Sequence, residues 1–441
     1  MKKRLLVVAL NEFNKELLEE VAERYSLPNI KRILDLNVVE THAPDLYESR
    51  YLEPWCQWVS IHTGTPAASH KIRNLGDVPN LGEKQLWESL SDSGITSGVW
   101  SALNARLGEA PNCKFFLPDP WTFSETATPK ELNRVLNFPR FVAKNRLSPY
   151  KPKAFSTFMS FLLPFIRRPK MVGKLIRMAP RVLKRLAATP EPYVLFAITE
   201  YFSTQLFIEY KRRFDPQFSI IYLNTLAHIQ HYYWQKDSIP ENERFRYGFG
   251  LVDEMLGCLL DQRQPGEDIV VLNAMQQANS NDEPNWSGYR PIDQTQFLDA
   301  IGIRPARIEE LMTIEAHLFF DKELECNLAC QKLNDITVDG EPFFFVEKDK
   351  HDPCKFFYRP NYFADIPNTA VLKYENGEFP FFDYFKSLGV RTGHHQQIGH
   401  AITSLEWPQE TFINYELFDC IHEFFKVDSS LNRSPSELPA V

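Results

Sequence analysis

Two pairs of histidines are the side chains best suited to bind a metal or transfer a proton. His228 and His231 lie three residues apart just past a predicted strand, next to aromatic residues, and His394 and His395 are adjacent to each other. Neutral imidazole binds transition metals and its charge changes near neutral pH, so either pair could supply a ligand or a general base. The alternative is an aromatic-lined loop in which hydrogen-bonded histidines have a structural role only.

A second group of candidates is the cluster Glu53-Pro-Trp-Cys-Gln-Trp58. Cys56 would act as a nucleophile if a helix N-terminus and a nearby histidine lowered the pKa of its thiol. Gln57 would donate a hydrogen bond to a substrate, and Trp58 would contact the substrate. The two tryptophans could instead pack against the start of a helix, which is their more common role.

Alternating strands and helices must position these residues. Short apolar runs between polar residues predict buried parallel strands, and helical patterns lie between them. The predicted strands are 5–10, 218–223 and 269–272, and the predicted helices are 15–24, 29–36 and 85–93. This order predicts an α/β fold with a mostly parallel sheet and helices on both faces.

The ends of the predicted strands add polar residues to the candidates. In parallel sheets, ligands bind at the carboxyl ends of the strands. Asn11 and Glu12 directly follow the first predicted strand, and Asn273 follows the third. The predicted catalytic residues are therefore Glu12, Cys56, Gln57 and His228, and the predicted substrate-binding residues are Asn11, Trp58, Asn273 and His394.

Four segments form an ordered set along the chain. They are Leu5-Leu-Val-Val-Ala-Leu-Asn-Glu-Phe-Asn14 followed by Pro28-Asn-Ile-Lys-Arg-Ile33, Trp58-Val-Ser-Ile-His-Thr-Gly64 followed by Pro66 and His70, the stretch 220–234, and Gly393-His-His-Gln-Gln-Ile-Gly399. Together they resemble the alkaline phosphatase superfamily, in the branch of type I phosphodiesterases and nucleotide pyrophosphatases. The third segment is similar to that family's "Y----D---H--W" strand and loop, and the fourth to its closing "GTH---G" motif. The resemblance implies an alkaline-phosphatase-like core with inserted cap segments.

The resemblance also implies a particular chemistry. In competent members, two divalent metals support the transfer of a phosphoryl or sulfuryl group to a Thr, Ser or modified Cys. Most of the required residues are replaced in this sequence. The replaced positions are Asn11, Pro54 at the nucleophile position, Ala227, and Asn273-Ala-Met-Gln276 in place of "SDHG".

Only two of the metal ligands of that family match, His231 and His395. His228 or Glu12 could complete one nonstandard site for a single Zn or Mn ion, because such sites generally need three or four protein ligands. Without such a third ligand no cofactor is expected. Two metals are not expected, so the sequence predicts a degenerate metal site.

A basic, Phe-rich segment interrupts the pattern of strands and helices. Residues 132–190 contain 14 Lys or Arg and no Asp or Glu, although the whole chain has a net charge of −8. The segment could be a solvated cap, or residues 151–185 could contact an anionic membrane surface. Its charge could also attract a phosphate-bearing substrate. No nucleic-acid partner is expected, because the protein is acidic overall and has no recognised binding motif.

The predicted organisation follows from these segments. It comprises a first core segment at 1–131, a basic Phe-rich cap at 132–191, a second core segment at 192–280, an inserted subdomain at 281–382, a core closing segment at 383–427 and a flexible tail at 428–441. Seven cysteines without a CxxC pair indicate reduced, buried thiols. The apolar run near the start is too short for a signal peptide, and no stretch is long enough to span a bilayer. We therefore expect a cytoplasmic location, with a peripheral location on the inner face of the membrane as the variant.

The leading functional hypothesis is a divergent phosphodiesterase- or phosphatase-like protein that acts on or binds an anionic, phosphate-bearing small molecule. A nucleotide- or lipid-linked sugar in surface glycan synthesis would be such a ligand. As an enzyme, the protein would be a hydrolase or transferase of the phosphoryl-transfer type with a nonstandard site. The alternative is a catalytically inactive pseudoenzyme that serves as a binding or scaffold protein at the membrane surface.

Overall fold

The computed structural model describes most of the chain, in two compact units. The described residues are 2–45, 51–144, 152–188, 192–234, 242–279, 286–311, 314–350, 352–391, 393–407 and 409–428. The first unit comprises Met1–Phe141, Pro152–Asn279 and Gly393–Val441, and the second comprises Val142–Lys151 and Ser280–Thr392.

The first unit is built around an eight-stranded sheet with the order β20-β2-β19-β6-β1-β5-β3-β4. Its strands are β1 (Arg4–Leu10), β2 (Asn37–His42), β3 (Ser97–Trp100), β4 (Cys113–Leu117), β5 (Phe218–Leu223), β6 (Glu267–Leu272), β19 (Ile398–Thr403) and β20 (Thr411–Ile413). Strands β6, β1, β5, β3 and β4 run parallel, and β19 is antiparallel to both β6 and β2. Nearly every residue of β1 and β5 is buried, which explains why these strands are apolar throughout instead of alternating.

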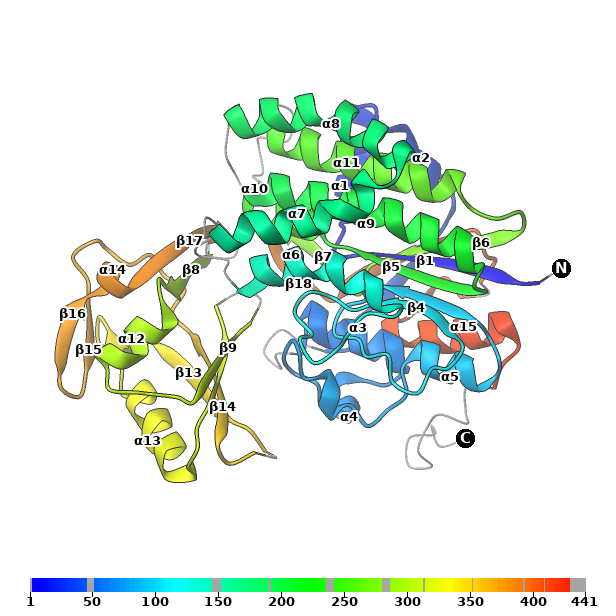
Figure 1. Cartoon of the computed structure of the whole chain (residues 1–441). Helices are drawn as coiled ribbons and strands as arrows, with labels where there is room; N and C mark the ends of the chain where they lie inside the picture. Colours follow the sequence, from blue (N-terminus) through cyan, green and yellow to red (C-terminus); the bar gives the residue numbers. More distant parts are fainter. Residues whose placement is uncertain are drawn as a thin grey trace. The chain divides into compact units, whose positions relative to one another are not determined.

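Helices cover both faces of this sheet (Figure 1). One face carries α1 (Lys15–Arg24), α2 (Pro28–Leu34), α9 (Pro192–Phe214), α10 (Thr225–Tyr233) and α11 (Glu243–Asp261), and the other carries α3 (Pro54–Thr63), α4 (Ala67–His70), α5 (Leu86–Asp92) and α15 (Leu417–Phe425). The predicted α/β fold with a mostly parallel sheet and helices on both faces is confirmed.

The helices begin and end where the sequence provides caps. Helix α1 has the predicted bounds, and its N-cap Asn14 accepts a hydrogen bond from the Leu17 N–H at 2.8 Å. Helix α2 begins one residue earlier than predicted, because Pro28 fits the first helical position. Helix α3 ends at Thr63, and its C-cap Gly64 has a φ of 70° and leaves no room for a Cβ beside Phe418.

One local prediction is wrong. The residues after β5 were expected to form a loop, but Thr225–Tyr233 form helix α10. The first N–H groups of this helix are satisfied by the carboxylate of Glu200 on α9, which accepts hydrogen bonds from the backbone N–H groups of Asn224 and Thr225. His228 and His231 are therefore one helical turn apart, and they are held by a regular helix.

The basic segment is helical. It forms α6 (Asn133–Lys144), α7 (Pro152–Ile166) and α8 (Pro169–Ala188), with Phe161 and Phe165 buried against the rest of the first unit. Among the described residues, no helix is both long enough and apolar enough to cross a membrane.

The second unit consists of small antiparallel sheets and two main helices. Its helices are α12 (Gln294–Ala300), α13 (Glu323–Asn334) and the short α14 (Phe381–Tyr384). Its strands are β8 (Trp286–Pro291), β9 (Arg307–Glu310), β10 (Ala316–Phe319), β11 (Thr337–Val338), β12 (Glu341–Pro342), β13 (Phe344–Lys348), β14 (Lys355–Pro360), β15 (Val371–Tyr374), β16 (Gly377–Pro380) and β17 (Phe385–Arg391). Residues 383–391, assigned above to the closing segment of the core, belong to this unit because β17 pairs with β8.

Candidate metal centre

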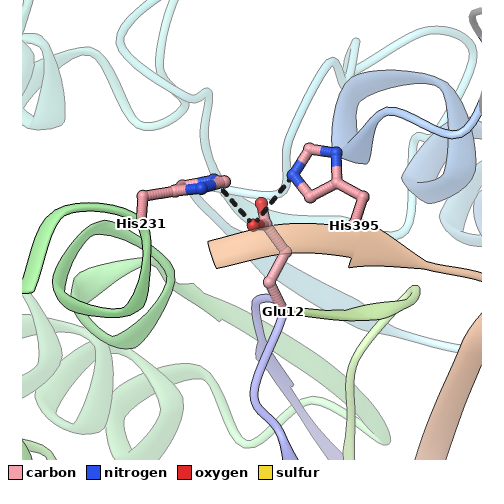
Figure 2. A group of neighbouring side chains, drawn as sticks. All are labelled: Glu12, His231 and His395. Carbon is pink, nitrogen blue, oxygen red and sulfur yellow. Dashed lines mark hydrogen bonds and ion pairs between the residues drawn. The ribbon is translucent and has the colours of Figure 1, made fainter. Parts of the chain in front are cut away.

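Three side chains from distant parts of the first unit meet at the end of β1. The carboxylate of Glu12 and the imidazoles of His231 and His395 each offer a ligand atom, and these atoms lie within 4.8 Å of one another. Glu12 follows β1, His231 lies on α10, and His395 lies on β18 (Gly393–Gln396), which pairs with β7 (Gln276–Asn279). Figure 2 shows the two imidazoles approaching Glu12 from opposite sides. Within the described ranges, this is the one group of three or more His, Cys, Asp or Glu side chains arranged to hold a metal.

The backbone at Glu12 turns its carboxylate toward the two histidines. Glu12 has a φ of 55° and is almost fully buried. Its carbonyl oxygen accepts hydrogen bonds from the side chain of Gln230 at 2.7 Å and from the backbone N–H of Gln277 at 3.3 Å. These hydrogen bonds fix a backbone conformation that residues other than glycine rarely adopt.

The carboxylate of Glu12 is held at both oxygens. Oε1 accepts a hydrogen bond from the Asn11 amide at 2.7 Å, and Oε2 accepts one from the Gln277 amide. Oε2 also faces Nε2 of His231 at 3.0 Å and Nε2 of His395 at 3.2 Å. Two imidazoles thus share one carboxylate oxygen.

Each imidazole is oriented from behind by an oxygen. Nδ1 of His231 lies 3.2 Å from the carbonyl oxygen of Gly393, and Nδ1 of His395 lies 3.5 Å from the Glu53 carboxylate. Because a carbonyl oxygen only accepts, Nδ1 of His231 carries the proton and Nε2 points toward Glu12. Metal-binding histidines in proteins are usually held in this way, with the second nitrogen donating to a carbonyl or carboxylate.

The electrostatics of the cluster favour a charged carboxylate. Burial alone would raise the pKa of Glu12, but the attraction and hydrogen bonds of His395 and His231 outweigh burial and hold this pKa well below its usual value. The carboxylate is therefore ionised at neutral pH. Positive charge at this position, either protons on the imidazoles or a metal ion, stabilises the ionised carboxylate.

The donor set fits one divalent metal. Two imidazoles and a carboxylate are a common set for Zn²⁺ or Mn²⁺, and they leave further coordination positions open. In the part of the chain that the structure describes, no second group of this kind occurs. The amide of Asn11 donates to Glu12 and to Asn224 at 2.8 Å, and its oxygen accepts from the Trp58 indole at 2.8 Å.

Several predicted residues lie outside this cluster. The ring of His228 packs against Phe196 and Tyr232. His394 precedes His395 in β18, and successive side chains of a strand point to opposite faces, so His394 points away from Glu12.

The predicted residues on α3 and β6 have structural contacts. Burial raises the pKa of the Cys56 thiol well above its usual value, which opposes the thiolate that a nucleophile needs. The Gln57 amide donates to the Asp45 carboxylate and to the Tyr51 carbonyl oxygen, both at 2.7 Å. Asn273 donates to the Phe13 carbonyl oxygen at 2.6 Å and accepts from the backbone N–H of His400 at 2.7 Å.

Three contributors were given no role from the sequence, although Glu53 belongs to the predicted cluster 53–58. Gln230 and Gln277 support Glu12, and Glu53 supports His395. A glutamine does not by itself indicate a binding site, so Gln277 in β7 gave no signal. Gln230 on α10 is adjacent to His231, which was a signal. Glu53 directly precedes Pro54, where the family resemblance implies a nucleophile, and this proximity was the available signal.

Comparisons with known proteins give likeness of fold only. No model of a known protein family matches the sequence, and no curated protein matches it. Phosphonoacetate hydrolase from Sinorhizobium meliloti 1021, in complex with phosphonoformate, is similar in structure, with a TM-score of 0.44, 16% identity and coverage of 98% of this chain and 96% of that chain.

Two other solved structures are similar. Murine ectonucleotide pyrophosphatase/phosphodiesterase 5 has a TM-score of 0.43, 10% identity and coverage of 97% of this chain and 96% of that chain. A variant of alkaline phosphatase PafA has a TM-score of 0.48, 10% identity and coverage of 100% and 99%. All three are members of the alkaline phosphatase superfamily.

Proposed function

We propose that this protein binds one divalent metal at Glu12, His231 and His395 and uses it to hold a phosphate-bearing small molecule. The carrying observation is the geometry of the cluster: three ligand atoms lie within 4.8 Å, and both imidazoles are oriented from behind. A divalent ion held there would polarise a phosphate oxygen and neutralise its negative charge.

The surrounding residues set limits on the reaction. Pro54 at the start of α3 has no nucleophilic group, and the buried thiol of Cys56 is a poor nucleophile. Hydrolysis by water, without a covalent intermediate on the protein, is therefore the reaction that these residues favour. Glu53 contacts His395 and is 24% exposed, so it is the carboxylate of this group best placed to meet a ligand that arrives from solvent.

The proposed ligand class is a phosphodiester or sugar phosphate. A nucleotide- or lipid-linked sugar used in surface glycan synthesis belongs to this class, and a lipid-linked ligand would require a location on the inner face of the membrane. The basic helix α8 would attract such an anion. Asn11, Gln57, Trp58 and Asn273, predicted to contact a substrate, would in this proposal support the site through the contacts described above.

The second candidate is a pseudoenzyme that binds ligands or partners without catalysis. It is supported by the absence of ligand atoms at Ala227 and Ala274 and of a nucleophile at Pro54. Retention of a polar, well-oriented cluster at Glu12 favours ligand binding in either case.

The first experiment is elemental analysis combined with a substrate panel. Wild-type protein, loaded with Zn or Mn, is compared with the His231→Ala, His395→Ala double variant on aryl phosphodiesters, phosphomonoesters and phosphonates. The matched control is His228→Ala, His394→Ala, which removes two neighbouring histidines of α10 and β18 without removing a proposed ligand.

We expect about one metal per chain in the wild type and the control, and none in the His231, His395 variant. Turnover that follows the metal supports the enzyme. A bound metal with no turnover on any member of the panel supports the pseudoenzyme. Loss of metal in the control alone would contradict the proposed ligands.

A further inference from the structure

The outer side of helix α8 exposes large apolar side chains. Ile176 and Leu183 have 67% and 66% of their surface exposed, the largest values among the large apolar residues in the described ranges of the first unit. Met159 and Ile166 on α7 are also exposed. Exposed apolar side chains that lie together on one surface mark interaction sites, whereas singly exposed ones do not.

Ile176 and Leu183 lie on one face of α8, opposite the face that packs on the rest of the first unit. Ile176 and Leu183 are seven residues apart, which is two helical turns, so they point to the same side. Met171 and Met178 have the same spacing, and both are buried. Arg185 donates hydrogen bonds to the Tyr193 hydroxyl at 2.8 and 3.0 Å and so helps to fix the packed face on α9.

Basic residues flank the exposed face. Arg177 and Lys184 directly follow Ile176 and Leu183, and both are exposed. Residues 132–190 contain no acidic side chain to balance them. The nearby carboxylate of Glu254 on α11 is engaged by Arg181 at 2.7 Å.

We infer that the face formed by Ile176, Arg177, Pro180, Leu183 and Lys184, here called the α8 face, docks on an anionic lipid surface. Its apolar side chains would enter the boundary between headgroups and acyl chains, while its basic side chains would meet anionic headgroups. This inference does not depend on the metal centre.

Charge decides between the possible occupants. A second copy of the chain would place Arg177 and Lys184 against the same positive charges, which disfavours self-association through this face. A lipid surface offers both negative charge and an apolar layer, and therefore matches both components of the α8 face.

The test is sedimentation of the full chain with lipid vesicles. Vesicles of phosphatidylcholine alone are compared with vesicles that also contain phosphatidylserine. The variants are Ile176→Ser with Leu183→Ser, and Arg177→Ser with Lys184→Ser. The matched control is Leu324→Ser with Leu328→Ser, which changes two exposed leucines of α13 that are 69% and 52% exposed.

We expect binding to vesicles that contain phosphatidylserine, weaker binding to phosphatidylcholine alone and a loss of binding at high salt. The Ile176, Leu183 variant should bind roughly tenfold more weakly or worse, and removal of each basic residue should weaken binding about fivefold. The control should bind like the wild type.

Three results would overturn the inference. They are no binding of the wild type to either vesicle, equal binding by the wild type and both α8 variants, and a self-associated state of the wild type that the Ile176, Leu183 variant abolishes without any vesicle binding. Because the metal content is measured separately, failure here leaves the proposed metal centre unaffected.

Discussion

The carboxylate of Glu200 should make the stability of this protein depend on pH. Glu200 lies on α9 and closes the N-terminus of α10, the helix that carries His231. Its carboxylate accepts hydrogen bonds from the N–H groups of Asn224 and Thr225 at 2.6 and 3.1 Å and from the Thr225 hydroxyl at 2.5 Å. Burial raises the pKa of Glu200 from its ordinary value of 4.5 to about 7, although these hydrogen bonds favour the charged form.

The sign and size of the effect follow from this pKa. Because the pKa is raised in the folded protein, Glu200 contributes stability that is fully present below pH 4.5 and is lost as pH rises through about 7. The difference between the two pKa values corresponds to about 3 kcal/mol. Glutamine at this position cannot titrate, and its amide nitrogen cannot accept a hydrogen bond; relative to the wild type with a protonated Glu200, this should cost about 1 to 3 kcal/mol.

The assay is urea unfolding of the wild type and Glu200→Gln at several pH values. The free energy of unfolding of the wild type should exceed that of Glu200→Gln most below pH 4.5. We expect this difference to shrink by up to about 3 kcal/mol as the pH rises past about 7. Glu209→Gln, which changes a half-buried carboxylate on the same helix, is the control and should show no comparable trend. A difference between wild type and Glu200→Gln that is constant, or that grows as pH rises, would refute the reasoning.

Three further predictions concern the core and the candidate centre. Asn11→Asp should lower the melting temperature of the metal-free protein, because the new carboxylate would face that of Glu12, at a cost of about 1 to 3 kcal/mol. In a thermal shift assay, added Zn or Mn should restore part of the lost stability. No effect of the metal would count against the site. Cys56 should react with a thiol reagent more slowly than the half-buried Cys258 and Cys354 in peptide mass spectrometry, because its thiol is fully buried and its pKa is raised, and early labelling would contradict this. Lys211→Met should destabilise by about 3 to 5 kcal/mol, because it leaves the buried carboxylate of Glu267 without its partner; addition of Glu267→Leu should recover much of that stability in urea titrations, and an equally large loss in the double variant would be the contrary result.

Much of the fold could be predicted from the sequence because buried parallel strands have a strong local pattern. The runs that became β1, β5 and β6 are apolar on both faces, and such runs are interpretable without knowledge of their neighbours. The loop expected after β5 was wrong for a reason that no local pattern contains. The start of the helix there is satisfied by Glu200 on α9, which lies 24 residues before Asn224 in the chain.

The candidate centre could be predicted only incompletely. His231 and His395 were predicted as a pair from motif order, and Glu12 from its place after a strand. Glu12 joins the two histidines because its positive φ turns its carboxylate toward them. His394 is excluded because side chains alternate along β18, so that His394 points away from the cluster. Neither feature can be read from residue types, so His228 and Glu12 were equivalent candidates at that stage.

The central claim is a single metal held by Glu12, His231 and His395, and anomalous diffraction from crystals grown with Zn or Mn tests it most directly. We predict one anomalous peak, within about 2.0 to 2.2 Å of Nε2 of both histidines and of a Glu12 carboxylate oxygen. Two peaks near this cluster would contradict the claim that the site holds a single metal. The absence of any peak there, with the metal bound elsewhere or not at all, would contradict the claim of a metal centre.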